Sequence, residues 1–203
     1  MKDNTNYSLL KKIFKANGEY ITREDVDNAN ISSWFLSDFV KRNNLNKIAP
    51  GFYASDNYIV DKYFILQRRY PKYIFAGLSS LYLLGLTDKI PTDIEVSSPQ
   101  NYHPSRSKID LLIVHKLSNK NIYELGIKEV KTMFGNIVKT YDEERTICDV
   151  IKHHDKYDGE TFIKAIKFYV RTINNQSKLF KYARELGIEK KVYEVIEVVV
   201  NAD

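Results

Sequence analysis

Apolar side chains recur at intervals of three and four residues in the first part of the chain, and this spacing predicts three helices. The first spans residues 5–17 and is amphipathic, with Gly18 suited to end it. Thr22, followed three residues later by Asp25, predicts an N-cap and a capping box for a helix of about two turns. The third helix is expected to begin at Ser32 or Ser33. Its expected buried face consists of Trp34, Phe35, Leu36, Phe39 and Val40.

A short hairpin is predicted directly after the third helix. Residues 47–54 read K-I-A-P-G-F-Y-A, two strand-like runs joined by Pro50 and Gly51, which are strong turn formers. A helix, a turn, a second helix and a two-stranded wing together describe a winged helix-turn-helix. The first domain is therefore expected over residues 1–57, with a connector helix over residues 58–70.

A winged helix-turn-helix suggests a surface for double-stranded DNA, because the second helix of the motif enters the major groove. Serine and asparagine can hydrogen-bond base edges, and lysine and arginine neutralise phosphates. The expected groove contacts are Ser33, Ser37, Lys41, Arg42, Asn43 and Asn44. The expected wing contacts are Lys47 and Tyr53. The alternative for these polar residues is an ordinary solvated helix face.

Residues 71–203 are predicted to form a second domain, which makes the whole chain α+β. The apolar run at residues 74–86 predicts a largely buried helix. Strands are expected at residues 93–99, 108–115, 122–130 and 137–139, with a polar loop at residues 99–107 that carries His103 and Arg106. Helices are expected at residues 142–154, 160–172, 176–186 and 189–200.

Composition and charge narrow the function without assigning it. With 203 residues and a net charge of +5, the chain favours polyanionic partners such as nucleic acid. The single cysteine, Cys148, excludes an internal disulfide and a cysteine-rich zinc site, and its T-I-C-D-V-I setting predicts a buried position on a helix. The polar N-terminus and the lack of a long apolar run predict a cytoplasmic protein with no membrane contact.

An enzymatic alternative concerns the carboxylates of the second domain. Asp93, Glu95 and Asp110 on neighbouring strands, after the glycine-serine segment at Gly77, loosely match a nucleotidyltransferase, which holds Mg²⁺ with carboxylates. Gly77 is nevertheless expected inside the apolar helix, whereas such an enzyme needs its glycine in a loop near the phosphates. This alternative is therefore weaker than a purely binding role.

A nuclease and a metal site are two further alternatives. Asp110 with Glu129 and Lys131 has the D…E-x-K spacing of metal-dependent nucleases, a spacing that arises by chance in a chain rich in lysine and glutamate. His153 and His154 are adjacent, so on a helix their side chains point about 100° apart and cannot share one ion. We therefore expect no bound metal.

Three segments carry a resemblance to a known family. They are the winged region ending in I-A-P-G-F-Y, the segment A-G-L-S-S-L-Y-L-L-G-L, and the segment Y-D-E-E-R-T-I-C-D-V-I-K-H-H, whose E-R-T-x-x-D core is the most distinctive. In these segments the chain resembles the AbiEi-type antitoxins of bacterial abortive-infection (AbiE) systems, which are type IV toxin–antitoxin systems. In architecture the resemblance covers nearly the whole chain.

The resemblance implies a non-enzymatic protein without a cofactor that has two roles in phage defence. The winged domain would repress its own operon by binding inverted repeats in the promoter. The second domain would counteract a nucleotidyltransferase-like toxin without forming a stable complex with it. The expected antitoxin surface is Glu144, Arg145, Asp149 and Lys152. From spacing alone, Arg145 and Asp149 would instead form an i, i+4 ion pair on a helix surface.

Overall fold

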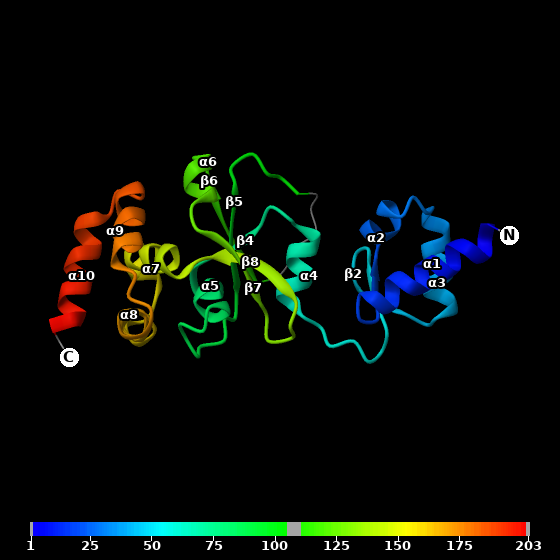
Figure 1. Cartoon of the computed structure of the whole chain (residues 1–203), viewed down its shortest axis with the longest axis horizontal. Coiled ribbons are helices and arrows are strands. Elements are labelled where there is room, and N and C mark those ends of the chain that lie inside the picture. The colour runs from blue at the N-terminus through cyan, green and yellow to red at the C-terminus, as the bar shows by residue number, and fades with distance from the viewer. Residues whose placement is uncertain (1, 105–110, 202–203) are drawn as a thin grey trace. The chain divides into compact units, whose positions relative to one another are not determined.

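The structure is a computed structural model that describes residues 2–104 and 111–201. It has a mixed α+β fold with N-terminal helices and a small sheet, followed by a larger mixed sheet and a helical tail (Figure 1). The chain divides into two compact units, Met1–Ile65 and Leu66–Asp203. The boundary falls within helix α4 (Lys62–Arg69), inside the segment expected to connect two domains.

The N-terminal unit contains the expected three helices, α1 (Lys2–Ala16), α2 (Arg23–Asn28) and α3 (Ser33–Arg42), and the expected hairpin of β2 (Asn46–Ala49) and β3 (Phe52–Ala54). The capping box is confirmed, because the Thr22 hydroxyl accepts from the Asp25 N–H and the Asp25 carboxylate accepts from the Thr22 N–H. One strand was not predicted: β1 (Tyr20–Thr22) pairs antiparallel with β3, giving the order β1-β3-β2.

The core of this unit lies between the helices and the small sheet. Leu10, Ile21, Val26, Leu36 and Phe39 pack together and are nearly inaccessible to solvent. The prediction for Trp34 was wrong, because its side chain is 63% exposed. Leu36 and Phe39 supply the buried positions of α3. Trp34 lies one residue after the start of α3, outside the stripe that these two residues define.

Helix α4 is shorter than predicted. Residues 58–61 are not helical, and the helix begins at Lys62. The buried carboxylate of Asp61 accepts hydrogen bonds from the N–H groups of Tyr63 and Phe64 in the first turn, where a helix supplies no backbone acceptor. The side-chain cap therefore sets the start of the helix.

The C-terminal unit contains a five-stranded mixed sheet in the order β6-β5-β4-β8-β7. The strands are β4 (Ile74–Phe75), β5 (Ile94–Pro99), β6 (Leu112–Leu117), β7 (Ile127–Lys131) and β8 (Ile137–Tyr141). β5 and β6 are parallel, as are β4 and β8, whereas β4 with β5 and β7 with β8 are antiparallel. The strands expected at 93–99 and 137–139 are confirmed. Residues 105–110, which include Arg106 of the predicted loop and the start of the strand expected at 108–115, lie outside the described part of the chain. The described part of that expected strand is β6, which begins at Leu112.

Two sequence predictions in this unit were wrong in element type. The run at 74–86 is not one helix: strand β4 comes first, and α5 (Gly77–Leu83) follows it. Gly77 has a φ of +54°, a backbone conformation that favours glycine and separates the two elements. The strand expected at 122–130 is instead α6 (Lys120–Glu124), capped by Asn119, followed by β7. A local side-chain cap outweighed the apolar pattern there.

The helical tail was predicted correctly. It consists of α7 (Glu143–Lys152), α8 (Gly159–Thr172), α9 (Gln176–Glu185) and α10 (Glu189–Asn201), with a short 3₁₀ turn, η1 (His154–Lys156), after α7. Helix α7 contacts the other three (Figure 1). Its Ile147, Cys148 and Ile151 are fully buried in the core that these helices share. None of the helices formed by the described residues combines the length and the apolar character that crossing a bilayer requires.

Candidate functional site

The polar residues predicted to meet DNA lie on the accessible surface of the N-terminal unit. Tyr53 is the exception, being partly buried within the hairpin. The exposed residues are Ser33, Ser37, Lys41, Arg42, Asn43, Asn44 and Lys47. On the hairpin, Lys47 of β2 pairs directly with Tyr53 of β3.

Several of these side chains have partners within the unit. The Arg42 guanidinium lies 2.8 Å from the Asp38 carboxylate, one turn earlier on α3. The Asn43 amide donates to the Tyr7 hydroxyl at 2.9 Å and to the Phe39 carbonyl at 2.8 Å, so Asn43 closes the end of α3. Neither Lys41 nor Lys47 has an ion-pair partner among the described residues. Their ammonium groups are therefore the cations on this surface most available to a phosphate.

Trp34 adds an aromatic side chain to the same surface, and its exposure was not predicted from the sequence. Its ring lies edge-on to Phe35, with the ring centres 5.0 Å apart, and most of it faces solvent. Trp34, Ser37 and Lys41 are three and four residues apart, so they follow one side of α3. No feature of the sequence distinguished Trp34 from the apolar residues beside it.

In the C-terminal unit, a cleft of about 480 Å³ lies where strand β4 turns into α5. Its walls come from β5, β6, one side of α7 from its first turn to its last, and the residues after α7. The lining residues are Ala76, Gly77, Glu95, Ser97, Val114, His115, Lys116, Leu117, Arg145, Asp149, Lys152, His153, Lys156 and Tyr157. Three of the four residues predicted as an antitoxin surface therefore line this cleft, and Glu144 does not.

Glu95 forms the floor of the cleft beside Gly77. Its carboxylate accepts from the Leu78 N–H at 3.2 Å and lies 3.1 Å from Nε2 of His115. A Cβ on Gly77 would lie 2.2 Å from a Glu95 oxygen, so only glycine permits this approach. Gly77 is thus the first residue of α5, at a strand–helix junction, and not an interior residue of a helix begun at residue 74 as expected. Glu95, however, is already engaged by this chain.

Arg145 is the largest buried side chain of the E-R-T-x-x-D core, with only 2% of it exposed. Its Nε donates to Asp149 at 3.0 Å, and its Nη1 donates to the carbonyls of Ile122 at 2.5 Å and Leu125 at 3.1 Å. Burial raises the pKa of the Asp149 carboxyl, and the Arg145 charge opposes that shift. The ion pair expected from the spacing is present, but it lies inside the unit instead of on its surface.

Glu144 is also buried, with 3% of its surface exposed. Its carboxylate lies 2.8 Å from Lys178 of α9 and near the Tyr169 hydroxyl of α8. Glu144 and Arg145, which were expected on an antitoxin surface, are thus buried, and both side chains hold α7 to its neighbours. Lys152, in contrast, is exposed at the edge of the cleft.

The other enzymatic alternatives have little geometric support. Glu129 and Lys131 lie on β7, at the opposite edge of the sheet from β6, and Asp110 lies outside the described residues. Within the described ranges, no group of three or more histidine, cysteine, aspartate or glutamate side chains could hold a metal ion. His154 contacts Lys191 through Nδ1 at 2.9 Å. His153 has a pKa lowered by burial and by Lys156.

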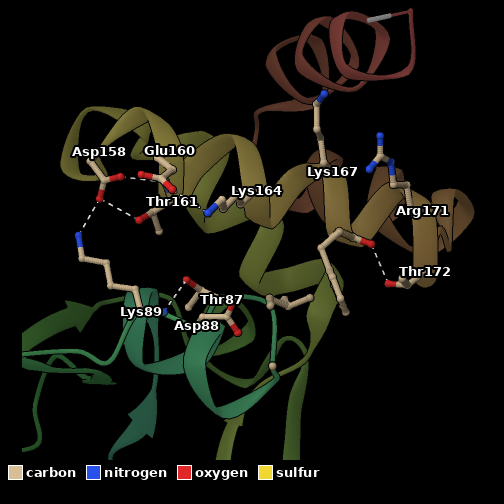
Figure 2. Close-up of a pocket in the computed structure, with 13 residues that line it drawn as sticks. Thr87, Asp88, Lys89, Asp158, Glu160, Thr161, Lys164, Lys167, Arg171 and Thr172 are labelled. Carbon is tan, nitrogen blue, oxygen red and sulfur yellow. Dashed lines mark hydrogen bonds and ion pairs between the residues drawn. The ribbon is translucent and has the colours of Figure 1, made fainter. Parts of the chain in front are cut away.

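A second, wider cavity of about 870 Å³ separates the loop at residues 85–89 from helix α8 (Figure 2). Lys89 reaches across it to Asp158 at 2.7 Å, and Asp158 also caps α8 by accepting from the Thr161 N–H. The hydrogen bond from Lys89 lowers the pKa of Asp158. Lys164 pairs with Glu160 at 2.6 Å. The charges of this cavity are thus largely balanced by one another.

Comparison with known proteins shows a similarity in fold to a solved structure. No protein-family model and no curated protein matches the sequence. Among solved structures, the chain is similar to the crystal structure of the Rv2827c protein from Mycobacterium tuberculosis, with 14% sequence identity and a TM-score of 0.53. The alignment covers 89% of this chain and 71% of that chain. At this level of identity, the likeness shows that the two chains share a mixed α+β fold.

Proposed function

We propose that the N-terminal unit is a winged helix-turn-helix that binds double-stranded DNA through α3 and the β2–β3 hairpin. The observation that carries this proposal is the exposed polar face of α3, followed directly in the chain by a hairpin that presents Lys47. A helix of this kind fits the major groove, and a basic residue on an adjacent hairpin can reach the flanking phosphates. The net charge of +5 is in keeping with this partner.

We further propose that the whole chain is an autorepressor and antitoxin of the AbiEi type. It would bind inverted repeats in its own promoter and counteract a nucleotidyltransferase-like toxin without a stable complex. Support comes from the E-R-T-x-x-D core, whose residues join α7 to α6, α8 and α9. The core would then stabilise the C-terminal unit, and the toxin-opposing surface would be formed by neighbouring exposed residues such as Lys152.

The DNA-binding proposal is tested with the triple variant Lys41→Ala, Arg42→Ala and Lys47→Ala. Binding to the DNA upstream of the gene is measured over a salt series, with unrelated duplex of equal length for comparison. Each lost phosphate contact flattens the slope of log K against log salt by about 0.9, so the slope should fall by about 2 to 3. Affinity should decrease for every sequence, because phosphate contacts carry no sequence information.

A matched control is the triple variant Lys11→Ala, Lys12→Ala and Lys15→Ala, which removes the same charge from the exposed side of α1. Its salt slope should stay close to that of the unmodified protein. Equal slopes for all three proteins would overturn the assignment of α3 and the hairpin. In a separate variant, Ser33→Ala should change the preference among promoter sequences while leaving the salt slope unchanged.

A further inference from the structure

The buried guanidinium of Arg145 has hydrogen-bonding capacity that the protein does not use. Nε and Nη1 are occupied by Asp149 and by the carbonyls of Ile122 and Leu125. The two N–H groups on Nη2 have no hydrogen-bond partner among the described residues. The side chain lines the 480 Å³ cleft and is held over the Tyr141 ring, 4.3 Å from its centre. Arg145 therefore brings a buried positive charge with two unused donors to the lining of this cleft.

The carboxylates of the cleft do not compete for those donors. Glu95 is engaged by the Leu78 N–H and by His115, and Asp149 is engaged by Nε of Arg145. The lining contains four permanent cations, Lys116, Arg145, Lys152 and Lys156, against these two carboxylates. Among the described residues, neither Lys152 nor Lys156 has an ion-pair partner. The cleft thus carries excess positive charge on both its buried wall and its rim.

We propose that this cleft binds the phosphate groups of a nucleotide. A planar guanidinium matches the oxygens of a phosphate in bidentate fashion, and lysines at the rim supply further charge at variable positions. The volume lies within the range of about 300–1,000 Å³ that is usual for small-ligand sites. Val114, Leu117 and Tyr157 form an apolar part of the lining, which suits a sugar and a base beside the charged groups. This site is separate from the proposed DNA contacts and does not depend on them.

The proposal is tested by isothermal titration of the full chain, in the absence of DNA, with ATP, GTP, CTP and UTP. Pyrophosphate and adenosine are titrated in parallel, since the first has only the phosphates and the second lacks them. We expect at least one nucleoside triphosphate to bind and adenosine to give no heat of binding. Pyrophosphate binding without any nucleotide binding would overturn the nucleotide assignment.

The residues are tested with the double variant Lys152→Ala and Lys156→Ala, both of which are exposed and outside the core. Loss of two charge-assisted contacts should weaken nucleotide binding by about tenfold or more. The control is Lys181→Ala with Lys190→Ala, which removes the same charge from exposed positions that do not line the cleft. It should bind like the unmodified protein.

A third variant, Arg145→Lys, keeps the charge but removes the planar pair of donors. Its folding is checked by circular dichroism before titration, and a folded Arg145→Lys protein should also bind the nucleotide at least about tenfold more weakly. If no triphosphate binds at millimolar concentration, the proposal is wrong. It is equally wrong if the lysine double variant and its control bind nucleotide with the same affinity.

Discussion

Replacing Arg145 with alanine is the most informative stability experiment that the structure suggests. The change removes a guanidinium that is 98% buried, together with its bond to Asp149 and its two bonds to the carbonyls of Ile122 and Leu125. Those carbonyls belong to α6 and to the turn that follows it, so Arg145 joins α7 to the segment before β7. All three acceptors would lose their charged partner at once.

The size of the destabilisation by Arg145→Ala follows from the acceptors that are left without a donor. Removing one partner of a buried ion pair costs about 3–5 kcal/mol, since the other charge stays desolvated. The Asp149 side chain is 19% exposed, so water can solvate part of its charge and the lower end of that range applies. Each carbonyl left without a donor adds about 1 kcal/mol or more unless water reaches it. Together these contributions give an expected loss of about 5 kcal/mol in the free energy of unfolding of the C-terminal unit.

Two spectroscopic probes can report the two units separately in urea unfolding. The only tryptophan of the sequence, Trp34, lies in the N-terminal unit, so its fluorescence follows that unit. Helices α7 to α10 lie in the C-terminal unit and contribute strongly to far-ultraviolet circular dichroism. With a typical urea dependence of about 1–3 kcal/mol per M, the Arg145→Ala midpoint by circular dichroism should fall by about 2–5 M.

The control for this experiment is Arg184→Ala, which removes an exposed arginine with one ion pair of 3.3 Å to Glu189. Its effect should stay below about 1 kcal/mol, because exposed pairs contribute little. A loss of less than about 1 kcal/mol for Arg145→Ala would refute the assigned role of the buried guanidinium. An equal shift of the Trp34 transition would refute independent unfolding of the two units.

Three further predictions follow from local geometry. Gly77→Ala should destabilise the C-terminal unit by more than Gly135→Ala. Both glycines have positive φ, but only at Gly77 would the added Cβ meet the Glu95 carboxylate. The urea midpoints of the two variants provide the comparison. Burial raises the pKa of Cys148 to about 12, so its thiol should react slowly with a disulfide reagent at pH 8 until urea unfolds the protein. Rapid labelling of the folded protein would contradict this. Thr22→Ala should lower the free energy of unfolding of the N-terminal unit, followed by Trp34 fluorescence, by about 1 kcal/mol. Ser32→Ala should lower it clearly less, because the Ser32 side chain makes no capping hydrogen bond.

The sequence by itself determined the local elements whose signals lie within a few residues of one another. The capping pair of Thr22 and Asp25, the turn at Pro50 and Gly51, and the helical spacing after residue 142 each act over one or two turns of chain. These signals need no distant partner, so helices α1 to α3, the hairpin and helices α7 to α10 could be predicted. The spacing of Arg145 and Asp149 likewise predicted their ion pair.

Tertiary structure decided which of these residues meet solvent and which segments pair. Strand β1 has only three residues and exists because β3, thirty residues later, supplies its hydrogen-bond partners. Trp34 faces solvent because Leu36 and Phe39 already fill the space behind α3. Arg145 is buried because α6 brings two carbonyls over it. Pairing and burial depend on contacts between distant parts of the chain, and a local pattern of apolar and polar residues does not encode those contacts.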